Sequence, residues 1–141
     1  MDGRATTDVV CPAKRERSLK RPPIWRAANL ASTLNEIASA SAVGFVLEES
    51  SISVPPDVAA ACEMLGLDPL YVANEGVAAA IVPAECSDAA IGALRSHPLG
   101  AAARAVGQVV AEHPGLVILR TAIGGTRIVD LLPGDQLPRI C

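Results

Sequence analysis

Apolar residues recur every three or four positions in three stretches of the chain, which is the spacing of one face of a helix. Asn29, or the pair Thr33 and Glu36, can cap the first of these helices, and Gly66 follows the second as a typical end signal. The three segments are residues 30–41, 54–65 and 86–96. We expect the first and third helices to pack through their apolar faces. In the second, the predicted inward face is Val58, Ala61, Cys62 and Leu65.

Short apolar runs that contain β-branched residues lie between and after these helices and predict strands. Proline and glycine separate the runs, and the Gly124-Gly125 pair indicates a hairpin turn between the last two. The order of the elements predicts an α+β (α/β layered) domain in which helices pack on a mixed sheet. The predicted strands are residues 43–47, 70–73, 77–82, 106–110, 116–120 and 126–132.

Composition narrows the function classes. The chain has 141 residues, of which 50% are hydrophobic and only 2% aromatic, so its core must be aliphatic. Recognition of single-stranded nucleic acid by stacking needs several aromatic side chains and is therefore disfavoured. No apolar run reaches the ~18 residues of a membrane span, and the N-terminus has no apolar signal core. We therefore expect a cytoplasmic protein without a membrane or nucleic-acid partner.

Charge divides the chain near residue 27. Residues 1–26 carry seven basic and three acidic residues, whereas residues 27–141 carry five arginines and twelve acidic residues. We interpret residues 1–27 as a disordered basic leader, with an arm for anionic partners as the alternative. The segment 133–141 contains two prolines and a glycine and predicts an extended, flexible tail.

The cysteines point to one candidate site, at the end of the chain. Cys11, Cys62, Cys86 and Cys141 form no Cys-x-x-Cys pair, so we expect neither a structural zinc site nor a disulfide framework. Cys62 and Cys86 lie in apolar helical patterns and are expected to pack in the core. Cys141 is the last residue of the predicted tail, where a thiolate can act as a mobile nucleophile or acceptor. An incidental terminal cysteine is the alternative.

Several blocks of sequence together resemble the C-terminal domain of the HypE family, the carbamoyl dehydratases of nickel–iron hydrogenase maturation. The resemblance covers residues 28–141, and the terminal Pro-Arg-Ile-Cys is its most specific part. The blocks are Leu30-Ala31-Ser32-Thr33-Leu34-Asn35-Glu36-Ile37-Ala38, Leu65-Gly66-Leu67-Asp68-Pro69-Leu70-Tyr71, Asn74-Glu75-Gly76, His97-Pro98-Leu99-Gly100, Thr121-Ala122-Ile123-Gly124-Gly125-Thr126-Arg127 and Pro138-Arg139-Ile140-Cys141.

The resemblance implies a fold, a reaction and partners. The fold is that of a PurM C-terminal-like domain. In the family, the carbamoyltransferase HypF places a carbamoyl group on the terminal thiol, which is Cys141 here. ATP with Mg then converts the thiocarboxamide to a thiocyanate, whose cyanide is passed to iron on a HypC–HypD scaffold. The glutamate of the Asn-Glu-Gly motif, Glu75 here, is the candidate base, although alone it would suggest an exposed turn residue. The family also forms homodimers.

The sequence also differs from full-length HypE proteins, and these differences limit the function that we expect of it. Full-length HypE proteins have an N-terminal ATP-binding domain. We expect this domain to be absent from the chain, and we therefore expect the chain alone to bind no ATP and to be inactive alone. We expect residues 28–132 to form the PurM C-terminal-like domain and residues 1–27 not to be HypE-like. A truncated remnant or non-catalytic interaction module is the alternative function. Another PurM-like synthetase is disfavoured because it needs no terminal cysteine. An exposed apolar patch is expected where the missing domain would pack.

Overall fold

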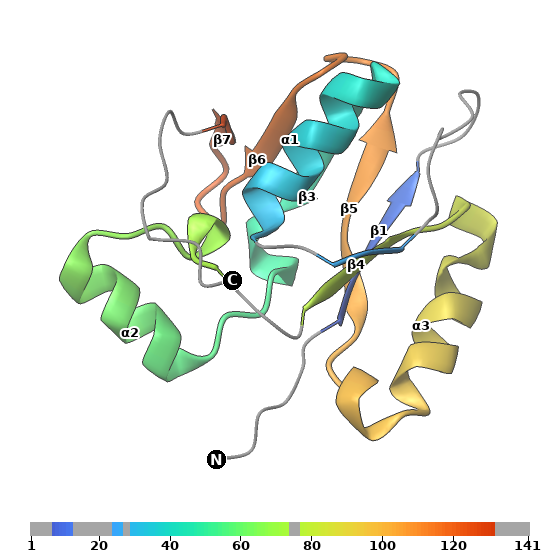
Figure 1. The fold of residues 1–141 in the computed structure, drawn as a ribbon, viewed down its shortest axis with the longest axis horizontal. Coiled ribbons are helices and arrows are strands. Elements are labelled where there is room, and N and C mark those ends of the chain that lie inside the picture. Colours follow the sequence, from blue (N-terminus) through green and yellow to red (C-terminus); the bar gives the residue numbers. More distant parts are fainter. Residues whose placement is uncertain (1–6, 13–23, 27–28, 74–76, 132–141) are drawn as a thin grey trace.

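The fold is a seven-stranded mixed sheet with three α-helices (Figure 1), seen in a computed structural model that describes residues 7–12, 24–26, 29–73 and 77–131. The spatial order of the strands is β2-β4-β1-β5-β3-β6-β7. The strands are β1 (Thr7–Pro12), β2 (Ile24–Arg26), β3 (Gly44–Glu48), β4 (Ala78–Ile81), β5 (Arg104–Val110), β6 (Val117–Arg120) and β7 (Thr126–Ile128). The helices are α1 (Leu30–Ser41), α2 (Pro56–Leu65) and α3 (Ser87–Arg95).

Both strand orientations occur, as the sequence predicts for a mixed sheet. Strand β1 runs parallel to β4 and β5, and β3 runs parallel to β6. The pairs β2–β4, β3–β5 and β6–β7 are antiparallel. A turn that includes Gly124 at φ 88° joins β6 to β7, so the hairpin predicted from the two glycines is confirmed.

Helix α1 covers the part of the sheet that holds the core. It lies over β3 and β6 (Figure 1), and its side chains Leu34 and Ile37 are buried with Phe45 and Leu119 of those strands. Asn29 caps the helix, because its side-chain oxygen accepts a hydrogen bond from the Ser32 amide at 2.7 Å. The predicted first helix, its cap and its inward face are therefore confirmed.

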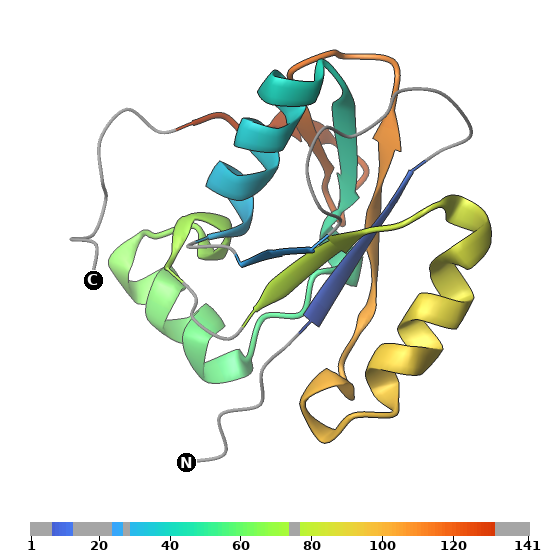
Figure 2. The same ribbon diagram turned by 45° about the vertical axis from the view of Figure 1, so that its right-hand side comes forward.

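Helix α3 packs beside β1 and β5, whereas α2 projects away from the sheet (Figure 2). The inward face expected for α2 is wrong except at Cys62, since Leu65 is 71% exposed and Val58 and Ala61 are also exposed. The apolar repeat in α2 has the helical period, but Cys62 is its one buried residue. Cys86, expected in the core, is exposed at the start of α3.

Two segments of the expected leader are strands. Thr7–Pro12 forms β1 between β4 and β5, and Ile24–Arg26 forms β2 at the sheet edge, so the expectation of disorder is wrong for them. The run Val9-Val10 is too short to predict a strand by itself. A position between two parallel neighbours supplies backbone hydrogen bonds on both sides, and this tertiary pairing outweighs the weak local signal.

Two predicted strands differ from the structure near the candidate site. Residues 70–73 were expected to be extended, but Pro69–Tyr71 forms a single 3-10 turn, called η2. Asp68 causes this, because its Oδ1 accepts a hydrogen bond from the Leu70 amide at 2.9 Å. The last strand ends at Ile128 rather than at residue 132. In the described part of the chain, no helix is long and apolar enough to span a membrane.

Candidate functional site

Both residues predicted to act in chemistry, Glu75 and Cys141, lie outside the residues that the structure describes. The structure does describe the segments that lead to them. Turn η2 precedes Glu75, and the stretch from β7 to Leu131 precedes the tail that ends in Cys141. The candidate site is therefore built from these two approaches, which lie far apart in sequence.

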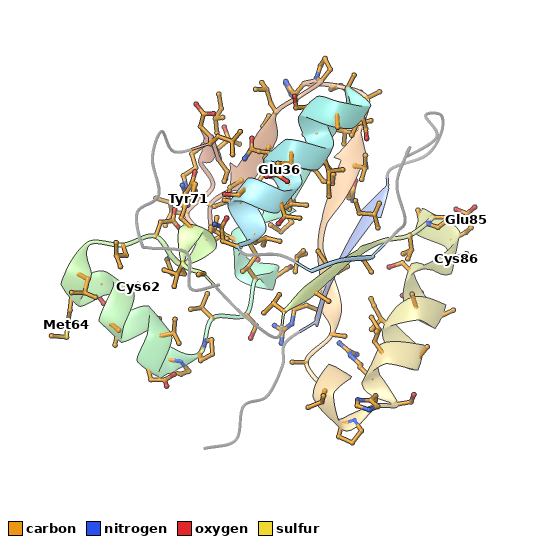
Figure 3. The ribbon with its side chains drawn as sticks, viewed as in Figure 1. Glu36, Cys62, Met64, Tyr71, Glu85 and Cys86 are labelled. Atoms are coloured by element: carbon orange, nitrogen blue, oxygen red, sulfur yellow. The ribbon has the colours of Figure 1, made fainter. Side chains whose placement is uncertain are left out.

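The approach to Glu75 is held by Asp68 and Leu70. Leu70 is 7% exposed and belongs to the hydrophobic core, so the turn is fixed to the domain by burial. The carboxylate of Asp68 accepts from the Leu70 amide with one oxygen and from the Arg127 guanidinium with the other. Tyr71 follows directly, with its side chain beside the lower end of α1 (Figure 3).

The segment that leads to the tail is held by contacts with β6 and α1. The Val129 side chain is fully buried, and its amide donates to the carbonyl of Val117 at 2.8 Å. The Val129 carbonyl accepts from the side-chain nitrogen of Asn35, also at 2.8 Å. Asn35 is a buried polar residue of α1 whose Nδ2 donates as well to the carbonyl of Ala31 at 2.9 Å. Both protons of its amide are thus used within the protein.

Two side-chain links join the two approaches. The Tyr71 hydroxyl donates to the carbonyl oxygen of Asp130 at 2.8 Å. The guanidinium of Arg127 contacts the carboxylate of Asp68 at 2.5 Å, a charge-assisted hydrogen bond between half-buried groups. We call these four residues, Asp68, Tyr71, Arg127 and Asp130, the tail anchor. Through these contacts, the segment that leads to Glu75 and the segment that leads to the tail are held together at one place on the domain.

The number of residues between the tail anchor and each candidate residue limits how far that residue can lie from the domain. Glu75 follows Tyr71 by four residues and Cys141 follows Asp130 by eleven. At about 3.3 Å per residue, these segments span at most roughly 13 Å and 36 Å. These lengths are upper limits on how far Glu75 can lie from Tyr71 and Cys141 from Asp130.

Burial raises the pKa of the Tyr71 phenol above its ordinary value of 10.0. The charge of Asp68 adds to this effect, Arg127 opposes it, Asp130 raises the pKa further, and the hydrogen bond to the Asp130 backbone lowers it. The phenol thus stays protonated at neutral pH and can serve as the donor that the geometry requires.

Four arginines of residues 29–131 each contact a partner within the protein. Arg127 and Arg120 pair with Asp68 and Glu48, while Arg95 and Arg104 donate to backbone carbonyls. Within the described residues there is no group of three His, Cys, Asp or Glu side chains arranged to hold a metal ion.

Comparison with known proteins places this architecture in a family. A family model described as "AIR synthase related protein, C-terminal domain" matches residues 27–119. The chain belongs to this family. The matched stretch of this AIR synthase related domain contains α1, the turn η2 and strands β3 to β5, and it ends within β6, before the second half of the tail anchor.

Relatives of the domain are named carbamoyl dehydratase HypE. The protein from Cupriavidus necator is 58% identical over 79% of this chain and 32% of its own length. Those from Rhizobium leguminosarum and Rhodobacter capsulatus are 52% and 49% identical over 95% and 99% of this chain. Such coverage reaches into residues 1–27, where we had expected no similarity. The chain spans only about a third to two fifths of these relatives.

Solved structures of HypE share the fold. A hydrogenase maturation protein HypE superposes with a TM-score of 0.76 at 42% identity, over 86% of this chain and 39% of that one. HypE in complex with ATP gives a TM-score of 0.72 at 38% identity, over 82% and 36%. HypE from a HypE–HypF complex gives 0.69 at 34% identity, over 78% and 35%. The mixed sheet with its helices is thus the fold of the HypE C-terminal part, as predicted.

Sequence reasoning missed the tail anchor, although its residues lie in or beside the motifs that carried the resemblance. Asp68 and Tyr71 lie in the motif of residues 65–71, Arg127 ends the motif of residues 121–127, and Asn35 lies in the motif of residues 30–38. Each looks like an ordinary turn or helix residue when taken alone. Only the sheet order, which places β7 next to β6, shows that they meet.

Proposed function

We propose that this chain carries the acceptor thiol of a HypE-type carbamoyl dehydratase. The observation that supports the proposal most strongly is the terminal Pro-Arg-Ile-Cys sequence on a tail whose described root is fixed beside the root of the Asn-Glu-Gly loop. Relatives named carbamoyl dehydratase HypE, similar along most of the chain, point to the same chemistry.

In the first step, the Cys141 thiolate attacks the carbon of an activated carbamoyl group held by a HypF-type transferase. A sulfur–carbon bond forms, the activating group leaves, and the product is an S-linked thiocarboxamide. The step needs a thiol that can enter another protein's active site. A tail of eleven residues beyond Asp130 provides that reach.

In the second step, the thiocarboxamide loses the elements of water and becomes a thiocyanate. Two N–H protons must leave, and the carbonyl oxygen must depart with its bonding electrons. ATP with Mg supplies the phosphoryl group that makes this oxygen a leaving group. We assign proton removal to the Glu75 carboxylate, which lies on the loop that follows η2.

We propose that this chain contributes the thiol and the base, and that dehydration needs an ATP-binding domain in addition. Cyanide transfer to iron on a HypC–HypD scaffold, a homodimer and a cytoplasmic location complete the proposal.

A non-catalytic module is the second candidate function. In this alternative the tail still accepts a carbamoyl group from HypF but is never dehydrated.

One assay separates the two functions. The chain is incubated with HypF, carbamoyl phosphate and ATP, with and without an added HypE ATP-binding domain, and thiocyanate is measured. Thiocyanate that forms only with the added domain supports the enzyme part. Carbamoylated thiol that never converts supports the module, and an unmodified tail contradicts both.

A further inference from the structure

We propose that the outer edge of β7 is a binding site for an extended, basic segment of a partner protein, which pairs with β7 as an added strand. The inference goes beyond the proposed function and does not depend on it, because neither Glu75 nor Cys141 takes part in it. Three features of the edge support it: open backbone groups, the exposed end of an apolar row, and negative charge.

The pairing of β6 with β7 fixes which backbone groups face the outer edge. Opposed residues of an antiparallel pair alternate between hydrogen-bonded and non-hydrogen-bonded positions. Gly125 and Val129 each bind the residue opposite them through a backbone hydrogen bond of 2.8 Å, so the backbone of Arg127, midway between them, faces β6 as well. The N–H and C=O groups of Thr126 and Ile128 therefore point away from β6. Among the described strands none lies on that side, because β7 is the last strand of the sheet (Figure 1).

The Tyr71 hydroxyl marks one end of the open edge. The same alternation turns the carbonyl of Asp130 outward, and the hydroxyl donates to it at 2.8 Å. The open part of the edge is thus limited to Thr126 and Ile128, each of which offers one N–H and one C=O group. An extended peptide can bind all of these groups, as a further strand of the sheet does.

An apolar row leads across the sheet to this edge. Val46, Ile118 and Ile128 are paired in register across β3, β6 and β7. Their neighbours Phe45 and Leu119 are buried with α1, so the row lies on the opposite face of the sheet. Val46 and Ile118 are half-buried, whereas Ile128 is 58% exposed. An added strand would place a side chain beside Ile128, and a β-branched or aromatic residue there gives a stabilising cross-strand pair.

Charge around the edge favours a basic partner. Four acidic and two basic side chains lie in or contact the β6–β7 hairpin and its exit, namely Glu48, Glu49, Asp68, Asp130, Arg120 and Arg127. Both arginines already pair with a carboxylate. Among the described residues, no basic side chain pairs with Glu49, which binds the turn at the Ala122 amide, or with Asp130 beyond the other end of β7. A lysine or arginine on each side of an apolar residue would complement these two charges.

A second copy of the chain fits this edge less well. Antiparallel pairing of two β7 strands would place Arg127 opposite its own counterpart, and like charges directly opposite each other destabilise a strand pair. Strand β7 also has only three residues, so the pairing of two such edges would bury little surface.

The test uses the full chain and a synthetic heptapeptide that alternates lysine and valine, and it measures amide hydrogen exchange by NMR. In the free chain, the amides of Thr126 and Ile128 should exchange roughly tenfold or more faster than that of Arg127, because only the last is bonded to β6. Saturating peptide should slow both amides, again by roughly tenfold. The same peptide with glutamate in place of lysine should bind about threefold or more weakly, with a difference that shrinks at high salt.

Two variants test the edge separately. Ile128→Pro removes an N–H that pairing with β6 does not use, and it should lower the affinity for the peptide roughly two- to tenfold. Ile128→Lys keeps this N–H but ends the apolar row and adds a like charge, so it should weaken binding as well. Leu99→Lys is the matched control, at a residue 52% exposed in the 3-10 turn η4 (Pro98–Gly100), and should bind like the parent chain.

Three results would overturn the proposal. The first is exchange at Thr126 and Ile128 as slow as at Arg127 in the free chain, which would show that the edge is already covered; if this protection grew with protein concentration, the occupant would be a second copy. The second is peptide that leaves both amides unchanged. The third is equal affinity of Ile128→Lys and Leu99→Lys for the peptide.

Discussion

The hydroxyl of Tyr71 reaches the backbone carbonyl of Asp130 at 2.8 Å across 59 positions of sequence. Tyr71 closes the turn before the loop of Glu75, and Asp130 stands at the start of the tail that ends in Cys141. One hydrogen bond therefore ties together the roots of the two segments to which we assign chemistry. Figure 3 shows the Tyr71 side chain close to the N-terminal half of α1, the helix that carries Asn35.

Replacing Tyr71 by Phe should lower the free energy of unfolding by about 0.5–1.5 kcal/mol, the net value of one hydrogen bond. The ring stays in place, so little apolar contact is lost. Urea denaturation with an unchanged m-value measures the effect. A stability equal to that of the parent chain would show that the bond to Asp130 is not formed in solution.

Stability should fall above pH about 10 because of Tyr71. Burial raises the pKa of the folded phenol above 10.0, so the folded state keeps its proton where the unfolded chain has lost it. The contribution is fully present below the unfolded pKa and disappears as the pH rises through the folded pKa. Denaturation curves at several alkaline pH values should show this decline in the parent chain. The decline should be smaller in Tyr71→Phe, and equal slopes would contradict the assignment.

Asn35→Ala should destabilise the domain by about 1–3 kcal/mol. The change leaves the carbonyl of Val129 buried without the bond that Asn35 now donates. Hydrogen exchange at Val129 and Asp130 should accelerate as well, because the tail approach loses its link to α1. The exposed neighbour Glu36, changed to Ala, is the control and should alter stability by less than about 0.5 kcal/mol. Equal effects of the two changes would argue against the Asn35–Val129 link.

The exposed apolar residues of α2 should promote self-association. Met64 is 88% exposed and Leu65 71% exposed on a helix that contributes only Cys62 to the buried residues. Changing both to Lys should reduce association, measured by light scattering at high concentration, with little effect on stability. Ile123→Lys, at a residue 96% exposed in the β6–β7 turn, is the matched control. Association that persists after the α2 changes would place the contact elsewhere.

Local patterns predicted most of the fold, and long-range pairing explains the errors. Helix α1, its Asn29 cap and the Gly124-Gly125 turn follow from spacing and residue type, and the structure confirms them. Strand β1 could not be predicted, because two valines in a basic segment become a strand only between β4 and β5. Helix α2 shows a different error. Its helical period predicts the helix and its apolar side, but the period does not show whether another element covers that side.

The contrast between local patterns and long-range contacts also explains what could be predicted of the candidate site. Cys141 and Glu75 were predicted from motifs, and they remain predictions because they lie outside the described residues. Tyr71, Arg127 and Asn35 could not be predicted as partners, because their contacts join segments about 60 to 95 positions apart. Such contacts depend on the order of strands in the sheet, and no local pattern encodes that order.

The most direct test of the account is the mass of the C-terminal peptide after the chain has been incubated with HypF, carbamoyl phosphate and ATP. The parent chain should gain the mass of one carbamoyl group on Cys141. Cys141→Ser should gain none, and the same peptide lengthened by one alanine after Cys141 tests whether the thiol must be terminal. We predict modification of the parent alone. An unmodified parent peptide, or equal modification of Cys141→Ser, would contradict the claim that the last sulfur carries the one-carbon unit.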